Sequence, residues 1–222
     1  SMMVGEMDVK NHSIVTKAVH SAGGRIAMQI LHAGRYAYSD KAVAPSPLKA
    51  PISPSTPSEL DEEGIEKQIS DIARSAYLAK CAGYDGIEVM GSEGYLINQF
   101  LVSHTNKRSD SWGGTYENRM RFPLEVLKRI RKEVGKNFLI IYRLSLIDLI
   151  PNGSSWDEVV YLAKKVESAL GPEWCDHRAR APNLRAFPRA FLRRGKSAHA
   201  RLVLEVIDGV TRRWQSLRRR DG

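Results

Sequence analysis

The sequence predicts an α/β protein built around a parallel sheet, with about three βα units. Three observations support this fold class. Segments with helical periodicity alternate with short apolar runs that are typical of buried parallel strands. Glycines follow several of the expected helices. The apolar content of 42% fits a globular core.

The first expected helix covers residues 9–22 and the first strand covers residues 25–31. Gly23-Gly24 separates the two segments and is expected to stop the helix. The strand is nearly all apolar, which is typical of burial on both faces. Residues 32–36 follow as a loop. The spacing of the apolar residues in the helix predicts one apolar face, made of Ile14, Val15, Ala18 and Val19.

A proline- and serine-rich segment, residues 41–58, predicts an extended loop. The polar and acidic residues 58–63 then predict a helix start with its cap at Ser58. This helix is expected to run to about Ala82, where Gly83 stops it. The second strand is expected at residues 86–90, and a long loop follows it.

Two more helices and one strand complete the expected body of the protein. The helices are expected at about 116–134 and at 156–170, and the strand at 138–145 lies between them. The order helix, strand, helix, strand, helix, strand, helix predicts a parallel sheet.

The chain changes character after Leu170. Residues 1–170 hold 21 Lys and Arg against 20 Asp and Glu, whereas residues 171–222 hold 13 against 5. We therefore divide the chain into a partial barrel, residues 1–170, and an Arg-rich tail, residues 171–222. Such a tail can bind nucleic acid or an anionic membrane. The alternative is a tail translated from an altered reading frame or a spliced exon.

Several classes of protein are disfavoured by the composition. We find no run of eighteen apolar residues, so no membrane span is expected. The first residues lack the pattern of a secretory signal. Cys81 and Cys175 form neither a disulfide framework nor a metal site, which favours a reducing, cytoplasmic compartment. No metal-ligand spacing is visible, and no metal is expected.

Three side chains near the carboxyl ends of the expected strands are candidates for a functional site, because βα barrels place their reactive residues there. Gln29 can form paired hydrogen bonds to a planar heterocycle. Arg143 can hold negative charge that develops on a ring or a carbonyl. Tyr95, between Gly94 and Leu96, can donate a proton from a rigidly held hydroxyl.

Each candidate has a structural alternative. Tyr95 could simply pack in a half-buried position, and Gln29 could be structural. Arg143 could pair with Glu88 or Asp85 for structural reasons. A histidine such as His32 is more often a satisfied loop residue than a ligand or a catalyst.

Five segments, taken in order, resemble the old yellow enzyme family of NADH:flavin oxidoreductases. This resemblance extends over roughly residues 9–170, and the order and spacing of the segments make it specific. The segments are residues 29–35 (QILHAGR), 83–88 (GYDGIE), 94–101 (GYLINQFL), 108–114 (RSDSWGG) and 118–122 (NRMRF).

Within that family the chain is most similar to the flavoprotein 2,4-dienoyl-CoA reductases. Many ene reductases carry a histidine at the position of Met90 and a histidine or asparagine at that of Glu93. Here residues 89–95 read VMGSEGY, as the dienoyl-CoA reductases do. The strand IIYRLS, residues 140–145, is similar to theirs as well.

The resemblance implies a TIM (β/α)8 barrel with FMN lying across the strand ends. Gln29 would bind the flavin pyrimidine edge, and Arg143 would lie near its N1–O2 side. Tyr95 would protonate the substrate, a 2,4-dienoyl-CoA thioester of fatty acid β-oxidation. Full-length relatives also carry FAD, a 4Fe–4S cluster and an NADPH site, whose motifs are absent here.

The resemblance also implies strands and a histidine-bearing segment that are not readable in this sequence. We therefore expect a truncated form that associates with itself through exposed sheet edges. Two alternatives have other functions. One is an inactive remnant that acts as a binding or assembly partner, and the other is a nucleic-acid binder acting through residues 171–222.

Overall fold

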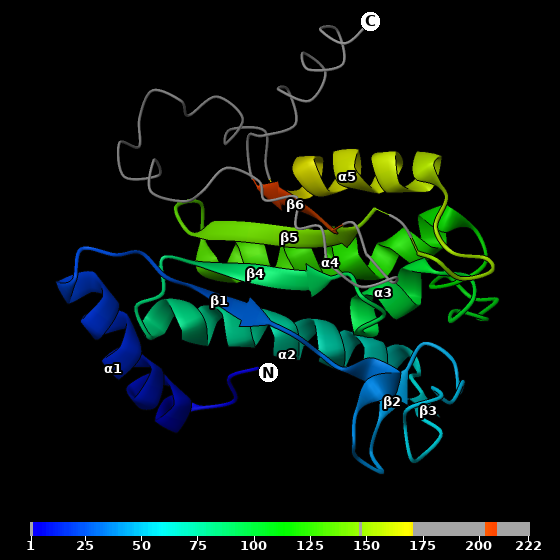
Figure 1. The fold of residues 1–222 in the computed structure, drawn as a ribbon, viewed down its shortest axis with the longest axis horizontal. Helices are drawn as coiled ribbons and strands as arrows, with labels where there is room; N and C mark the ends of the chain where they lie inside the picture. The colour runs from blue at the N-terminus through cyan, green and yellow to red at the C-terminus, as the bar shows by residue number, and fades with distance from the viewer. Residues whose placement is uncertain (1, 147, 171–202, 208–222) are drawn as a thin grey trace, which may run out of the picture.

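The computed structural model describes residues 2–146 and 148–170, together with the backbone of a strand at residues 203–207 (Figure 1). Most of the basic segment 171–222 lies outside the described residues. Its proposed roles in nucleic-acid binding and assembly therefore stay predictions, as does the boundary at residue 170.

The main sheet has the strand order β1-β4-β5-β6. Strands β1 (Ala27–Ile30), β4 (Gly86–Gly91) and β5 (Leu139–Ser145) run parallel to one another, as predicted. Strand β6 (Val203–Ile207) was not predicted, and it pairs antiparallel with β5. The expectation of two open sheet edges was therefore wrong at β5, because β6 occupies that edge.

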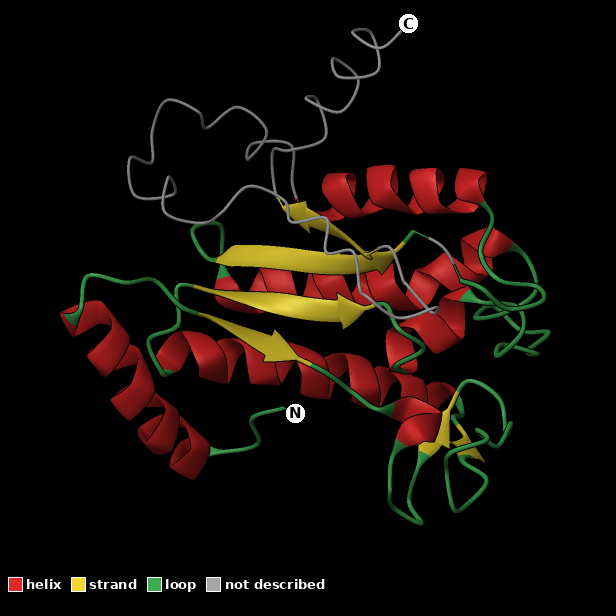
Figure 2. Ribbon diagram, in the orientation of Figure 1, coloured by secondary structure: helices red, strands yellow, loops and turns green. Residues whose placement is uncertain are grey.

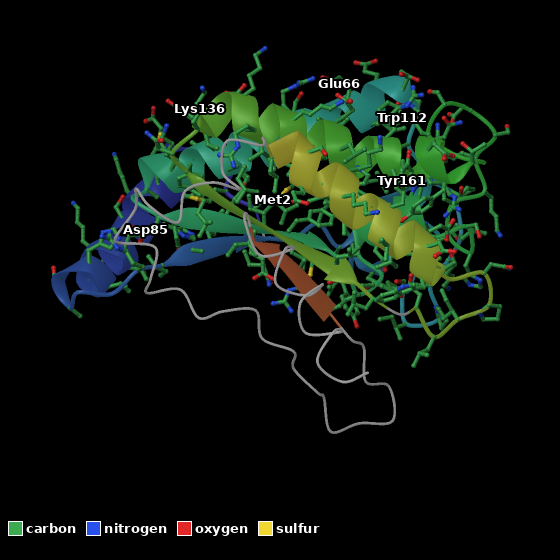
Figure 3. All side chains as sticks on the ribbon, turned by 90° about the horizontal axis from the view of Figure 1, so that it is seen from above. Met2, Glu66, Asp85, Trp112, Lys136 and Tyr161 are labelled. Carbon is green, nitrogen blue, oxygen red and sulfur yellow. The ribbon has the colours of Figure 1, made fainter. Side chains whose placement is uncertain are left out.

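Three helices cover one face of this sheet, as Figures 2 and 3 show. They are α2 (Glu62–Cys81), α4 (Tyr116–Val134) and α5 (Trp156–Leu170). The apolar stripe of each helix packs on the strands beneath it, which removes apolar area from water and stabilises the fold. Fully buried strand residues at this contact are Ile87, Val89, Ile140 and Tyr142.

Helix α1 (Glu6–Ser21) lies at the amino-terminal end of the sheet and packs beside α2. The predicted buried face of this helix was wrong. Ile14 is 71% exposed and Val15 is 50% exposed, whereas Thr16 is buried. The Thr16 hydroxyl donates to the Ala82 carbonyl over 2.6 Å. Polar contacts rather than the apolar stripe therefore set how α1 docks.

The proline-rich segment holds a small separate sheet, formed by β2 (Val43–Ala44) and β3 (Ser58–Glu59). The predicted helix cap at Ser58 was wrong, because Ser58 belongs to β3. Helix α2 is instead capped by Asp61, whose Oδ1 accepts from the Gly64 amide over 2.7 Å. The acidic pattern was correct, but the capping carboxylate lies three residues further along the chain.

A short helix, α3 (Leu96–Leu101), interrupts the segment after β4, where only a loop was expected. Its six residues are all buried, so it shows no amphipathic pattern. Figure 1 shows α3, β2 and β3 at the end of the sheet to which the parallel strands point. In the described part of the chain, no helix is both long and apolar enough to cross a membrane.

Candidate active site at the carboxyl ends of the strands

Gln29 and Arg143 are brought together by the pairing of three strands. Gln29 lies opposite Glu88 in the β1–β4 register, and its Nε2 donates to Glu88 Oε2 over 3.3 Å. Arg143 lies opposite Met90 in the β4–β5 register, and its Nε donates to Glu88 Oε1. A single carboxylate therefore links the two predicted cofactor-binding side chains.

This linked group lies on the sheet face that points away from helices α2, α4 and α5. Alternate residues of a strand face opposite sides of the sheet. Val89 and Tyr142 are fully buried on the helix-covered side, so Glu88 and Arg143 project from the other side. In a βα barrel this second face forms the interior, and its carboxyl end carries the reactive residues.

The Arg143 guanidinium lies between two carboxylates. Besides its bond to Glu88, its Nη1 lies 3.6 Å from Glu93 Oε1. The Arg143 side chain is 23% exposed and that of Glu88 is 17% exposed, so water screens the pair only in part. The structural pairing with Glu88 is therefore present. Asp85 is not the partner, because it binds His20 and Arg25 instead.

Tyr95 follows β4 at a turn with two unusual backbone positions. Glu93 has φ 63° and Gly94 has φ 79°, both in the left-handed region. The Glu93 amide donates to Ser145 Oγ over 3.2 Å, and the Gly94 amide donates to Asn98 Oδ1 over 2.7 Å. These bonds hold Tyr95 at the N-cap of α3. Among the described residues, its hydroxyl makes no hydrogen bond and is available to a ligand.

Sequence reasoning missed Gln99, which ties this turn to the loop after β1. Gln99 is 1% exposed. Its Nε2 donates to the Gly94 carbonyl over 2.7 Å and to the Ala33 carbonyl over 3.3 Å, and its Oε1 accepts from the Arg35 amide over 3.1 Å. A polar residue within the apolar run LINQFL was the available signal.

His32 supports the loop after β1 rather than pointing to a chemical role. Its Nδ1 accepts from the Gly34 amide over 3.0 Å, and its carbonyl accepts from the Leu96 amide over 3.0 Å. Burial lowers the pKa of His32 below its ordinary value, which favours the neutral ring that this acceptor role requires. The geometry favours the satisfied loop histidine over a ligand or catalyst.

The next turn, η1 (Gly34–Tyr36), places a second tyrosine beside Tyr95. The rings of Tyr36 and Tyr95 meet edge to face, with their centroids 6.2 Å apart. The Arg35 guanidinium carbon lies 5.5 Å from the Tyr36 ring centroid. The loops after β1 and β4 therefore form one polar and aromatic cluster at the carboxyl end of the sheet.

The fold and this cluster define the class of the protein, a βα-barrel protein whose candidate site lies at the carboxyl ends of the strands. A model of the NADH:flavin oxidoreductase / NADH oxidase family matches residues 1–189, and the chain belongs to this family. The match extends beyond residues 9–170, over which we noted the resemblance.

Two relatives illustrate the similarity in sequence. The chain is 41% identical over 160 residues to an NADH oxidase of Thermoanaerobacter brockii, which covers 70% of this chain and 25% of the relative. It is 35% identical over 162 residues to an NADH:fumarate oxidoreductase of Klebsiella pneumoniae, which covers 68% of this chain and 18% of the relative.

Solved structures confirm the old yellow enzyme resemblance and the incomplete barrel. A 2-naphthoyl-CoA reductase in complex with 2-naphthoyl-CoA matches with TM-score 0.72 and 36% identity, over 75% of this chain and 28% of that one. The old yellow enzyme homologue from Zymomonas mobilis matches with TM-score 0.69 and 31% identity, over 74% and 51%. The chain thus spans at most about half the length of these relatives.

Proposed function

We propose that this chain provides the flavin-facing and proton-donating part of an FMN-dependent oxidoreductase. The enzyme would use NAD(P)H to reduce carbon–carbon double bonds conjugated to a carbonyl group. One observation carries the proposal. Gln29 and Arg143, joined through Glu88, lie on the same sheet face, and Tyr95 follows the strand between them.

The residues present fit the pyrimidine edge of a flavin. That edge combines hydrogen-bond donors and acceptors, and the exposed amide of Gln29 offers one group of each kind. The half-buried Arg143 adds guanidinium N–H donors, which can hydrogen-bond to a ring oxygen that becomes more negative on reduction. Glu88 holds Arg143 through Nε and so fixes the direction of the guanidinium.

Bound FMN would supply the redox chemistry, taking a hydride from NAD(P)H and giving a hydride to one carbon of the double bond. Tyr95 would donate its hydroxyl proton to the other carbon, and water would restore that proton. The substrate gains two hydrogens and NAD(P)H becomes NAD(P)+. The free hydroxyl and the fixed turn at residues 93–95 support this role for Tyr95.

For the substrate we propose a thioester of coenzyme A, with 2,4-dienoyl-CoA as the specific candidate. Met90 and Glu93 stand where many ene reductases carry a polar pair that grips a substrate carbonyl. Met90 is 5% exposed and its sulfur accepts from the Ser92 hydroxyl over 3.3 Å, so it offers no strong hydrogen-bond donor. The similarity to 2-naphthoyl-CoA reductase also supports a thioester.

Titration of the purified chain with FMN, followed by fluorescence quenching, tests the cofactor site. We expect saturable binding that Gln29→Ala weakens roughly tenfold, because two hydrogen bonds to the ring are lost. Arg129→Gln is the control, because it removes a polar contact to a glutamate, Glu66, on the helix-covered side of the sheet and should leave FMN affinity unchanged. Equal affinity of Gln29→Ala and the parent chain would contradict the assignment.

The substrate class is tested with the FMN-loaded chain, reduced under anaerobic conditions. Rates of flavin reoxidation by 2,4-hexadienoyl-CoA and by 2-cyclohexenone are compared. Faster reoxidation by the thioester supports the coenzyme A assignment. Equal or faster reoxidation by the ketone would favour a general ene reductase instead.

A further inference from the structure

Arg35 is a charged side chain that the proposed chemistry does not use. It is half-buried, and its Nε is enclosed without a hydrogen-bond partner. Among the described residues, no carboxylate lies within ion-pair distance of its guanidinium. The neighbouring Tyr36 ring supplies a cation–π contact, which compensates a charge only in part.

Two other arginines of the described residues that are withdrawn from water have carboxylate partners. Arg108 pairs with Asp110, and Arg119 pairs with Glu158 at 2.7 Å. Burying a charge is costly unless a partner compensates it. Arg35 differs from these two, since no carboxylate of the described residues pairs with its guanidinium.

The backbone of Arg35 is held rigidly, which suits a binding group. Its amide donates to Gln99 Oε1 over 3.1 Å, and its carbonyl accepts from Ser53 Oγ over 2.6 Å. Gly34 makes this possible, because it has φ +58° and a Cβ there would lie 2.3 Å from Gln99 Oε1. The loop therefore presents Arg35 with little backbone freedom left to lose on binding.

The position of Arg35 indicates which molecule it would contact. The Tyr36 ring contacts both its guanidinium and the ring of Tyr95, the proposed proton donor. A guanidinium presents a planar fork of N–H donors that matches the oxygens of a carboxylate or a phosphate. We infer that Arg35 forms an oxyanion subsite beside Tyr95, which binds a carboxylate or phosphate group of the unsaturated substrate.

This inference rests on the proposed function for the role of Tyr95, but its test does not. Isothermal titration calorimetry on the full chain would use fumarate, acetyl-CoA and the neutral thioester S-acetyl-N-acetylcysteamine as probes. We expect Arg35→Gln to raise the Kd of an anionic probe roughly tenfold to a hundredfold, and to leave the Kd of the neutral thioester unchanged. If Arg35→Gln loses affinity for fumarate, the subsite binds a carboxylate. If it loses affinity for acetyl-CoA, the subsite binds a phosphate.

Two further variants separate binding from folding. Arg74→Gln removes an exposed arginine from α2 and should bind every probe as the parent chain does. Arg35→Lys keeps the charge and should recover part of the lost affinity, which a purely structural role would not explain.

Three results would overturn the inference. In the first, neither anion binds saturably to the parent chain. In the second, Arg35→Gln weakens binding of the neutral thioester as much as binding of the anions. In the third, Arg35→Gln weakens binding of FMN but not of riboflavin, which would show that Arg35 binds the phosphate of FMN rather than the substrate. A parent chain that binds the anions but not FMN would contradict the proposed function and leave the anion subsite supported.

Discussion

At the residue scale, the turn that carries Tyr95 combines strain with several restraining bonds. Glu93 is not a glycine, yet it adopts φ 63°, which costs free energy unless the surroundings enforce it. The hydroxyl of Ser145, from the next strand, accepts from its amide and so helps to enforce it. Such strain is typical of positions where the direction of a side chain matters.

Replacing Tyr95 by phenylalanine should lower the rate of substrate reduction about a hundredfold or more, because general acid catalysis contributes factors of this size. FMN affinity should stay unchanged, because the ring and the turn are kept. Stopped-flow reoxidation of the reduced flavin by dienoyl-CoA measures this rate. Tyr38→Phe, at a tyrosine that is 83% exposed, is the control. An unchanged rate in Tyr95→Phe would remove Tyr95 from the mechanism.

The sequence nominated Gln29 and Arg143 as polar residues within apolar strands and Tyr95 as a residue that follows one, and their roles stay predictions. It was not sufficient to find Gln99 or Arg35. Their importance depends on burial and on the partners that each side chain has or lacks. Those properties arise only when two distant loops meet, and one sequence does not report them.

At the scale of elements, Gln99 makes α3 a link between the loops after β1 and β4. Gln99→Leu should destabilise the chain by roughly 1–3 kcal/mol, since it removes the side-chain partners of the Gly94 carbonyl and the Arg35 amide, which are partly withdrawn from water. Urea unfolding followed by circular dichroism measures the loss. Compared with the parent chain, the variant should show faster hydrogen exchange at the amides of residues 33–36 and 93–96, and little change in α4. Uniformly faster exchange across the chain would contradict a local link.

A second link joins α1 to the sheet through Asp85, which Figure 3 labels near that helix. Asp85 accepts from His20 Nε2, Arg25 Nη1 and the Ile26 amide, each at 2.9 Å. Partial burial acts to raise the pKa of Asp85, but these hydrogen bonds outweigh it and the pKa lies below its ordinary value.

This lowered pKa predicts the pH dependence of the α1 contact. A carboxyl whose folded pKa is depressed adds stability above its unfolded pKa, near 4, and that stability is lost as pH falls through the lower folded value. Asp85→Asn should therefore cost roughly 1–2 kcal/mol at pH 7 and much less at pH 3. Urea unfolding at both pH values tests this, with Asp71→Asn as the exposed control. An equal cost at both pH values would exclude the charge as the cause.

Helical periodicity predicted the existence of α1, α2, α4 and α5, because long segments repeat the pattern often enough to be read. It did not predict α3, which is short and buried on all sides. It also assigned the wrong face of α1, since the docking of that helix depends on Thr16 and on polar contacts. Propensity and periodicity decide where a helix forms, whereas tertiary contacts decide which face it buries.

At the scale of the whole molecule, the two edges of the main sheet differ. Strand β6 pairs with the outer edge of β5. Among the described residues, no strand pairs with the outer edge of β1. Unpaired backbone groups on an edge strand form a template for another strand. This edge therefore remains a candidate for the self-association expected from the sequence, and β5 does not.

Self-association through β1 predicts that the apparent mass of the chain rises with concentration. Ala27→Lys should shift the distribution towards monomer, because a charged side chain on an edge strand opposes pairing. Light scattering coupled to gel filtration, at two concentrations about tenfold apart, measures the mass. Ile52→Lys adds the same charge at an exposed position in the proline-rich segment and should have no effect. A monomeric parent chain at both concentrations would show that the open edge of β1 does not drive association. Equal shifts in both variants would assign the effect to net charge rather than to this edge.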